Sequence, residues 1–480
     1  MPRRTKILAT LGPATDDPAV LDQILEAGVD VVRLNFSHGS AEDHIKRAEN
    51  VRNRAAAHGR QVGVLADLQG PKIRIQRFAD GGVDLVEGNG FVLDSALDAN
   101  AGTVERVGVT YASLVNDVKR GDTLLLDDGR LTLWIDRVEG TEIRCKVVIG
   151  GRLTNSKGIN LQGGGLSAEA LTEKDRADVI TAAKIKADYL AVSFPRTADD
   201  IHEARALLRA AGGHGAIVAK IERAEALQCI DEIIEAADSI MVARGDLGVE
   251  IGDAELPGVQ KDLIARARSA NRTVITATQM MESMIDSAMP TRAEVFDVAN
   301  AVMDGTDAVM LSAETATGKN PAAVIAAVNR VCLGAESQRS AMRSTHRIDS
   351  RFDRVDESIA MAAMYIANHT NIKAIAALTE SGATALWMSR ISSGIPIYAL
   401  SPHVNTRRLM TLYRGVYPTS FDISAGEHHG MNREAVDELV RRGAVRNGDL
   451  VLITKGDRMG LMGGTNAMTI VCVGEEDATK

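Results

Sequence analysis

A lysine and a glutamate stand two positions apart at the end of the apolar stretch AIVAKIE, residues 216–222. If this stretch is a strand, its side chains alternate between two faces, so Lys220 and Glu222 point the same way. Two interpretations follow. The pair is either a structural ion pair at a strand end or a catalytic ammonium beside a metal-binding carboxylate.

Polar side chains also gather at the ends of the neighbouring predicted strands. Glu222 and Asp246 come from adjacent strands and offer two hard oxygen ligands suited to Mg²⁺ or Mn²⁺. Arg33, Arg74 and Lys220 add positive charge, which suits a phosphorylated anionic substrate. The other polar residues at strand ends are Asn35, Ser37, His38, Asp67, Lys72, Thr276, Thr278, Ser312 and Glu314. With these neighbours counted, the functional interpretation of the pair is favoured over the ion pair.

Eight short apolar runs, separated by stretches of helical spacing, must position these side chains. Strands that alternate with helices pair in parallel, and eight such units in about the usual barrel length indicate a closed (β/α)8 barrel. An open doubly wound sheet is the alternative. The predicted strands lie at residues 6–12, 29–37, 61–69, 187–194, 216–222, 239–246, 272–280 and 306–314.

Two further units interrupt or follow this pattern. Short alternating runs with Gly and Asp turns predict a small β-barrel domain inserted at residues 71–165, between the catalytic barrel segments 1–70 and 166–340. The insert follows the carboxyl end of a strand, where barrel active sites lie, so we expect a lid. A polar stretch at 337–356 is a predicted linker, and a restarted pattern predicts a C-terminal α/β regulatory domain over 350–480.

Composition excludes several classes of protein. Hydrophobic residues make up 45% and charged residues 25% of the chain, as in soluble globular proteins. The net charge of −9 argues against nucleic acid or anionic membrane as a partner. No apolar run suits a membrane span or signal peptide, so we expect a cytoplasmic protein. The four widely spaced cysteines predict small buried side chains rather than a disulfide framework or zinc site.

Nine motifs, in this order, resemble those of the pyruvate kinase family over essentially the whole chain. Any one motif is weak, but nine at the right strand ends make a chance match very unlikely. They are RLNFSHG (33–39), GPKIR (70–74), KGINLQG (157–163), VSFPR (192–196), AKIE (219–222), MVARGDLGVEI (241–251), TATQMMESM (276–284), PTRAEVFDVANAV (290–302) and DAVMLSAETATGKNP (307–321). The resemblance implies a glycolytic homotetramer that converts phosphoenolpyruvate and ADP into pyruvate and ATP.

The resemblance also implies a role for each site residue. Glu222 and Asp246 would bind Mg²⁺ or Mn²⁺, and the backbone amides around Gly245 and Asp246 would bind the substrate carboxylate. Lys220, assisted by Arg33, would stabilise the phosphoryl group in flight. Thr278 would protonate the enolate through a water. The implied substrate-binding residues are Arg33, Arg74, Lys220, Gly245, Asp246 and Thr278, and the implied nucleotide-binding residues are His38, Arg74 and Lys157.

Many family members also hold a potassium ion, at positions that correspond to Asn35, Ser37, Asp67 and the carbonyl of Leu68. Potassium-dependent members typically have glutamate after the GP dipeptide, where this chain has Lys72. An ammonium near the same oxygens would compete with the cation and replace its charge. We therefore expect no need for potassium. The alternative is that Lys72 points to solvent and the site fills normally.

The C-terminal unit contains LTESGATA, residues 378–385. In the family this domain binds a sugar-phosphate or nucleotide effector. A turn that enters a helix at Thr379, Ser381, Gly382 and Thr384 suits a phosphate, although an ordinary helix cap is the alternative. The resemblance therefore implies a phosphorylated effector and allosteric regulation through this domain.

Two other functions stay open. One is a different metal-dependent barrel enzyme that acts on phosphoenolpyruvate or pyruvate, such as an aldolase or a dikinase, and strict ADP dependence would distinguish it. The other is a metabolite sensor that has kept the barrel and lost catalysis. Loss of Lys220, Glu222 or Asp246 would favour the sensor, and all three are present.

Overall fold

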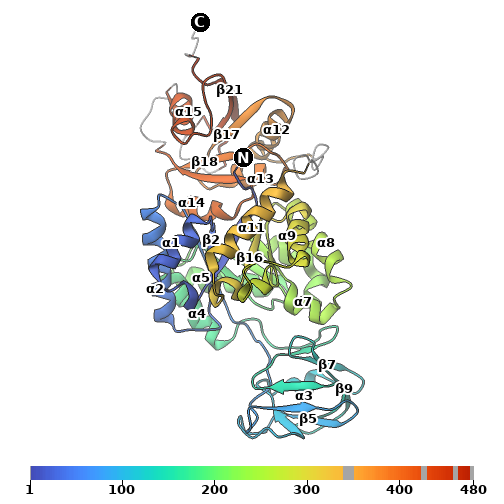
Figure 1. Cartoon of the computed structure of the whole chain (residues 1–480). Helices are drawn as coiled ribbons and strands as arrows, with labels where there is room; N and C mark the ends of the chain where they lie inside the picture. The colour runs from blue at the N-terminus through green and yellow to red at the C-terminus, as the bar shows by residue number, and fades with distance from the viewer. Residues whose placement is uncertain (1, 339–350, 423–429, 458–462, 476–480) are drawn as a thin grey trace.

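Three parts are stacked along the molecule, with the C-terminal domain at one end, a barrel in the middle and a β insert at the other end (Figure 1). The computed structural model describes residues 2–338, 351–422, 430–457 and 463–475. Most of the predicted linker, residues 339–350, lies outside the described residues, as do 476–480 of the predicted C-terminal domain. The domain boundaries given by the sequence stay predictions.

Eight parallel strands close into a barrel, which confirms the predicted (β/α)8 fold and excludes the open sheet. All eight predicted strands form, and each ends before its predicted carboxyl end because the polar residues there leave the ladder. In order around the barrel they are β1 (Lys6–Leu11), β2 (Val31–Asn35), β3 (Gly63–Asp67), β12 (Tyr189–Val192), β13 (Ala216–Ile221), β14 (Ser239–Ala243), β15 (Thr273–Ala277) and β16 (Ala308–Leu311).

Helices surround the barrel, and several begin at residues that cap them. Ser40, Thr172 and Thr291 each accept a hydrogen bond from the backbone N–H three residues ahead, which satisfies one of the free donors of a helix start. These residues precede α2 (Ala41–Ala57), α4 (Glu173–Lys184) and α9 (Arg292–Asp304). The other helices of this part are α1 (Pro18–Glu26), α5 (Ala198–Ala210), α6 (Ile230–Ala236), α7 (Arg244–Ile251), α8 (Leu256–Ser269), α10 (Ala313–Ala316) and α11 (Pro321–Glu336).

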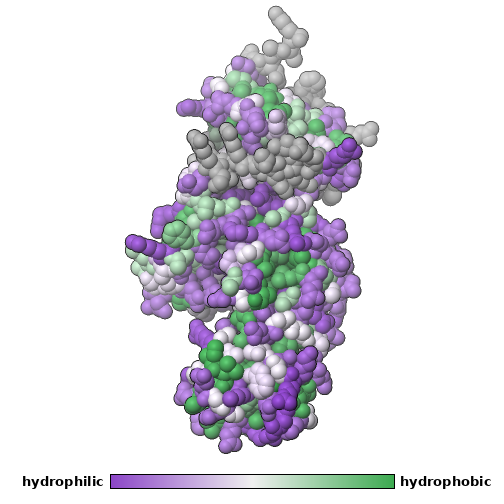
Figure 2. Space-filling view, turned by 90° about the vertical axis from the view of Figure 1, so that its right-hand side faces the viewer, coloured by the Kyte–Doolittle hydropathy of each residue, from purple (hydrophilic) through white to green (hydrophobic). Residues whose placement is uncertain are grey.

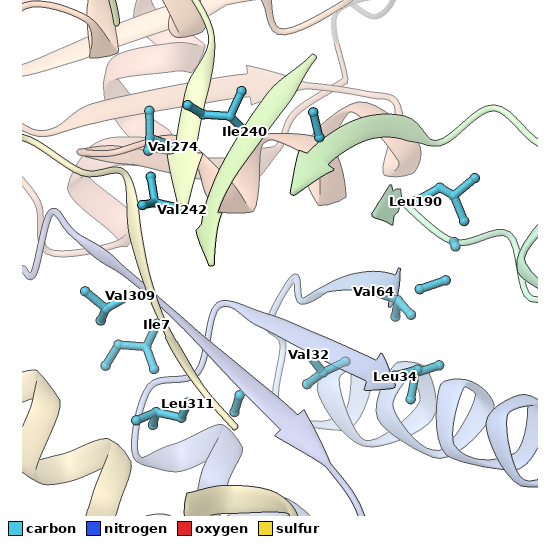
Figure 3. Packing of buried hydrophobic residues seen from close by; sticks show 14 of the residues in the cluster. Ile7, Val32, Leu34, Val64, Leu190, Ile240, Val242, Val274, Val309 and Leu311 are labelled. Carbon is cyan, nitrogen blue, oxygen red and sulfur yellow. The ribbon is translucent and has the colours of Figure 1, made fainter. Parts of the chain in front are cut away.

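Alternate side chains of the barrel strands belong to two different cores. One set packs with the surrounding helices; it includes Ile7, Val32, Leu34, Val64, Leu190, Ile240, Val242, Val274, Val309 and Leu311 (Figure 3). The other set, with Leu65 and Val218, joins a cluster that also contains Ile375 of the C-terminal domain. Asp67 and Lys220 follow Leu65 and Val218 by two positions, so they lie on this second face. That face changes from apolar to charged toward the carboxyl ends of the strands.

The segment between β3 and α4 is an all-β insert with one short helix, α3 (Leu114–Asp117). Its β character confirms the prediction, but its strands pair as two sheets rather than as one closed barrel. Strand β9 ends at Ile149, and after Gly150 the chain continues as β10, which starts at Gly151 and pairs with β4 instead of the larger sheet. The six-stranded sheet has the order β11-β7-β8-β9-β5-β6. The strands are β4 (Gly82–Leu85), β5 (Gly90–Asp94), β6 (Arg106–Gly108), β7 (Thr123–Leu126), β8 (Leu131–Glu139), β9 (Glu142–Ile149), β10 (Gly151–Thr154) and β11 (Ile159–Leu161).

The C-terminal domain is a five-stranded sheet of order β19-β18-β17-β20-β21 with helices, as predicted. Strand β19 was not predicted because Pro418 interrupts its sequence, yet an edge strand tolerates proline. The strands are β17 (Ile372–Leu378), β18 (Ile397–Ser401), β19 (Val416–Ser420), β20 (Leu450–Lys455) and β21 (Ala467–Cys472). The helices are α12 (Val355–His369), α13 (Ala383–Ser389), α14 (Val404–Leu409) and α15 (Met431–Arg441).

Two further expectations concern membrane-spanning helices and the four cysteines. Among the described helices, none is long and apolar enough to cross a membrane. All four cysteines are unpaired; Cys145 and Cys332 are buried as expected, whereas Cys229 and Cys472 are partly exposed.

Candidate active site

Lys220, on β13, lies within reach of three acceptors. Its Nζ is 2.6 Å from Ser193 Oγ, 3.0 Å from Glu222 Oε1 and 3.3 Å from Asp67 Oδ1. The strand alternation thus brings Lys220 and Glu222 together as the sequence predicts. Because Lys220 is only 9% exposed, its ammonium is largely removed from bulk water.

Charges within this cluster shift the pKa of each member. Burial opposes the charge of Lys220, but Asp67 and Glu222 outweigh it and raise the lysine pKa above its ordinary value. Burial also opposes the charge of Asp67, yet Lys220 and Arg33 hold its pKa below the usual range. Burial raises the pKa of Glu222, and the nearby charge of Asp246 adds to the rise while Lys220 works against it. Glu222 is therefore the carboxylate whose charge is least compensated.

Asp246 lies in the first turn of α7, directly after β14. Its Oδ1 accepts a hydrogen bond from Lys72 Nζ at 3.0 Å. From the sequence we expect the Lys72 ammonium beside the oxygens of the potassium site. In the structure it pairs instead with Asp246, a predicted metal ligand. The reason is geometric, since Lys72 starts the insert and its side chain reaches across to α7.

The donor set fits a divalent cation that is bound partly by substrate. Among the described residues, no group of three or more His, Cys, Asp or Glu side chains is placed to hold a metal. Mg²⁺ is commonly held by one or two carboxylates together with phosphate oxygens and water. Glu222 and Asp246 provide two such carboxylates, and burial together with the charge of Asp246 raises the pKa of Glu222, as expected for a carboxylate with uncompensated charge.

Thr278 follows β15 in a strained backbone conformation. Its φ is 69° and that of Gln279 is 55°, in the left-handed region that β-branched residues rarely enter. The Thr278 hydroxyl accepts the Gly245 N–H at 2.9 Å and donates to the Ala277 carbonyl at 2.6 Å. Arg244 donates to the carbonyl oxygens of Ala277 and Thr278, at 3.1 and 2.5 Å, and so fixes this turn.

Arg33 binds Asp67 directly, with Nε 2.6 Å from Oδ2, and its Nη1 donates to Thr10 Oγ1 at 3.1 Å. Asp67 is fully buried between Arg33 and Lys220. Asp67 therefore already has two cationic partners, although the family resemblance assigns it to a monovalent-cation site.

The other candidates for the monovalent-cation site surround Asp67. Asn35 Oδ1 accepts the Ser37 N–H at 3.1 Å. The Leu68 carbonyl accepts a hydrogen bond from Ser193 Oγ at 2.7 Å. Two of the predicted oxygen ligands thus already accept hydrogen bonds from the protein.

The predicted nucleotide-binding residues lie outside the buried cluster. Arg74 Nη1 donates to the Ser156 carbonyl at 2.9 Å, and Lys157 pairs with Asp127 at 2.7 Å. His38 is exposed in the turn after β2. His38 follows β2 of the barrel, whereas Arg74 and Lys157 belong to the predicted insert.

Three of the predicted effector residues form the turn that leads into the short helix α13, whose N-cap is Gly382. Thr379 Oγ1 accepts the Gly382 N–H at 2.9 Å, and Ser381 Oγ accepts the Ala383 N–H at 3.4 Å. Gly382 has a φ of 86°, which explains the glycine, and Thr384 is buried. These bonds are those of the helix-cap alternative, so the effector role stays a proposal.

Three residues that contact the site were not predicted. Ser193 and Phe194 lie in the VSFPR motif directly after β12, and Arg244 directly follows β14. The signal that could have found them was available, because the first residues after barrel strands face the active-site end.

A fourth residue that was not predicted, Glu250, does not follow a barrel strand directly, so its sequence position offered no signal. It lies within α7 and accepts the Ala224 N–H at 2.8 Å and the Asn160 amide at 3.4 Å. Burial raises the pKa of Glu250 to about 7. Its partners come from the insert and from the segment after β13, which sequence spacing does not bring together.

Comparisons with known proteins identify the family of this chain. The family models described as "Pyruvate kinase, barrel domain" and "Pyruvate kinase, alpha/beta domain" match residues 2–325 and 357–471. Pyruvate kinase II of Salmonella typhimurium is 58% identical over 475 residues, 98% of this chain and 99% of the relative. A pyruvate kinase of Haemophilus influenzae is 55% identical over 95% of this chain and 96% of its own length, and one of Mycobacterium intracellulare is 41% identical over 99% and 100%. The chain therefore belongs to the pyruvate kinase family of phosphotransferases.

Proposed function

We propose that this chain transfers the phosphoryl group of phosphoenolpyruvate to ADP, giving pyruvate and ATP in glycolysis. The observation that carries the proposal is the buried, protonated Lys220 between Asp67 and Glu222, with Asp246 nearby. A fixed cation in a water-poor site stabilises negative charge that develops on a phosphoryl group during transfer.

Glu222 and Asp246 would hold Mg²⁺ or Mn²⁺, and the bound ion would supply Lewis-acid chemistry at this site. For this role Asp246 must give up its ion pair with Lys72. Lys220 then faces the phosphoryl group. Arg33 assists with the N–H groups that it does not use on Asp67 and Thr10.

Protonation of the enolate involves Thr278 only indirectly. Its hydroxyl hydrogen is directed at the Ala277 carbonyl, so Thr278 has no free hydrogen for the substrate in this arrangement. A water ordered by this residue is the better proton carrier, since a threonine hydroxyl is a poor acid. The amides of Gly245 and Asp246, at the start of α7, bind the substrate carboxylate, and for this role the Gly245 N–H must leave Thr278 Oγ1.

The nucleotide lies between the barrel rim and the insert, where His38, Arg74 and Lys157 supply cationic or polar groups for its phosphates. The insert joins the barrel at the carboxyl ends of its strands, so its movement toward the barrel would enclose ADP. This arrangement supports the lid role expected for residues 71–165.

We also propose that the enzyme needs no potassium. The support differs from the sequence argument, because Lys72 pairs with Asp246. Instead, Asp67 is compensated by Arg33 and Lys220, and the Leu68 carbonyl is bound by Ser193. A monovalent cation at Asn35 and Ser37 would therefore add charge where charge is already balanced.

Regulation, assembly and location follow from the family resemblance. A phosphorylated effector would bind at Thr379, Ser381, Gly382 and Thr384, and the assembly would be a cytoplasmic homotetramer. Seen from the side of α8 and α9, hydrophobic surface gathers at the level of the barrel (Figure 2). Met289 is 72% and Phe296 69% exposed. Such apolar exposure supports a subunit contact.

The test is ADP-dependent pyruvate formation from phosphoenolpyruvate with Mg²⁺, while potassium rises from zero in a buffer free of other small monovalent cations. Full activity at zero potassium is expected. Activity that appears only with potassium would keep the kinase and reject the potassium proposal. No pyruvate at any potassium concentration would reject the proposed reaction and favour a sensor.

A further inference from the structure

Two adjacent residues after β12 contact both members of the Lys220–Glu222 pair. Resting on the proposed function, we propose that Ser193 and Phe194 are positioning residues that fix Lys220 and Glu222 for phosphoryl transfer. Ser193 does so with its side chain, and Phe194 does so with its backbone N–H.

The direction of the Ser193 hydrogen bonds follows from counting hydrogens. A hydroxyl has one hydrogen, and that of Ser193 goes to the Leu68 carbonyl at 2.7 Å, with Asp67 Oδ1 more distant at 3.5 Å. An ammonium can only donate. Ser193 therefore accepts from Lys220 at 2.6 Å. As a neutral acceptor it orients the ammonium without cancelling its charge.

A second count concerns Lys220 itself. Its three N–H groups face Ser193, Glu222 and Asp67, so all three are occupied in this structure. Binding of a phosphoryl group requires that one partner withdraw. Glu222 is the partner that can, since its charge is needed by a divalent cation. Ser193 then keeps the ammonium in place while the freed N–H turns to the substrate.

Phe194 fixes the other member of the pair. Its backbone N–H donates to Glu222 Oε2 at 2.8 Å, which leaves Oε1 facing Lys220. Its φ of 55° is unusual for a bulky residue, and such strain persists only where the surrounding structure enforces it. Arg223 packs over the ring at 5.6 Å. The strained turn therefore aims this N–H at the carboxylate.

Gly70 shows how tightly this turn is packed. A Cβ on Gly70 would come within 2.7 Å of the Ser193 Cβ and 3.0 Å of the Phe194 ring. Real side chains essentially never approach so closely, so the exit of β3 holds the turn after β12 in place. The hydroxyl of Ser193, which is 1% exposed, has little freedom to move away from Lys220.

The test compares Ser193→Ala and Ser193→Cys with Ser239→Ala in the full chain. Ser239 is a fully buried serine of β14 that donates to the Thr273 carbonyl at 3.0 Å, so it controls for loss of a buried hydroxyl. We expect kcat to fall about 10- to 100-fold in both Ser193 variants, because small errors in position are costly in catalysis. KM for phosphoenolpyruvate and Mn²⁺ affinity of the free protein, measured by electron paramagnetic resonance, should not change. Ser239→Ala should keep the wild-type kcat.

Three results would overturn the inference. They are a wild-type kcat in Ser193→Ala, recovery of kcat in Ser193→Cys, or an equal loss of kcat in Ser239→Ala. Recovery by cysteine would show that volume matters, since a thiol fills the site but is a weak acceptor. A wild-type chain without activity would instead reject the proposed function, so the two failures can be told apart.

Discussion

Two buried lysines stand at opposite ends of barrel strands, and their surroundings differ. Lys6, the first residue of β1, is 3% exposed, donates to the Val416 carbonyl at 2.6 Å and lies 4.7 Å from the Tyr417 ring centroid. Burial lowers its pKa to about 8. Lys220 lies between two carboxylates that raise its pKa despite burial. The comparison shows that paired carboxylates reverse the effect of burial on the lysine pKa at the carboxyl end, whereas at Lys6 burial prevails.

The balance of buried charge at the two ends differs in the same sense. The end that meets the C-terminal domain contains the Arg390–Asp307 ion pair, whose two side chains are 1% exposed and satisfied by each other and by backbone groups. At the opposite end, burial raises the pKa of Glu222, and the nearby charge of Asp246 adds to the rise. Uncompensated buried charge costs stability, so it persists where function uses it. We therefore assign stability to one end and chemistry to the other.

The largest expected effect is at Lys220. Lys220→Met should lower kcat by about 10³- to 10⁵-fold, the range measured when one cation that stabilises a transferred phosphoryl group is lost. Folding and Mn²⁺ binding should persist. Steady-state kinetics measures kcat, circular dichroism measures folding, and electron paramagnetic resonance measures Mn²⁺ binding.

The matched control for this variant is Lys6→Met, which removes a buried lysine at the other end. It should leave kcat unchanged, because Lys6 lies at the opposite end of the barrel strands from Lys220. Equal losses of kcat in the two variants would mean that the two ends do not differ in function.

Next in size is the ion pair at the end that meets the C-terminal domain. Arg390→Met leaves Asp307 as a buried charge, and the free energy of unfolding should fall by about 3–5 kcal/mol while kcat per folded molecule stays unchanged. Urea unfolding measures the change. Arg137→Met, at an exposed pair on the insert, should cost less than about 1 kcal/mol. A lower kcat in Arg390→Met would show that this end also serves catalysis.

A smaller effect concerns Glu250, at the contact of α7 with the insert. Its folded pKa of about 7 lies above the ordinary carboxyl value, so the folded state binds this proton more tightly than the unfolded state. That stabilisation is present at acidic pH and is lost as pH rises toward 7. As pH rises from 5 to 8, the free energy of unfolding of Glu250→Gln should therefore increase by about 2 kcal/mol relative to that of wild type.

Denaturant unfolding at several pH values tests this expectation. The control is Glu232→Gln at an exposed position on α6, which should show no such gain. A difference between wild type and Glu250→Gln that stays constant with pH would contradict the buried-carboxyl explanation.

The smallest effect belongs to Lys72. Lys72→Met removes a competitor from Asp246, so Mn²⁺ should bind the free protein about fivefold more tightly, in line with about 1 kcal/mol for a partly exposed ion pair. Electron paramagnetic resonance titration measures the affinity. Lys319→Met, which breaks an exposed pair with Asp286, should have no effect. Unchanged or weaker Mn²⁺ binding in Lys72→Met would show that Lys72 does not compete with the metal for Asp246.

Much of the fold was predictable because its rules are local. Period-two alternation put Lys220 and Glu222 on one side, and their 3.0 Å contact confirms it. Strand and helix spacing predicted the barrel. The predicted end of β15 was too late because Thr278 and Gln279 turn into the left-handed region, which no spacing rule reveals. Strand β19 was missed because proline argues against a strand unless its edge position is known.

The sequence by itself determined which residue types reach the carboxyl end of the barrel, because alternation and strand order depend on neighbours in the chain. Tertiary structure alone decided their partners. Lys72 pairs with Asp246, 174 positions away, and Ser193 joins Leu68 to Lys220. Glu250 is buried by residues of the insert and of the segment after β13. Such contacts depend on how distant segments pack, and packing fixes burial, charge balance and pKa.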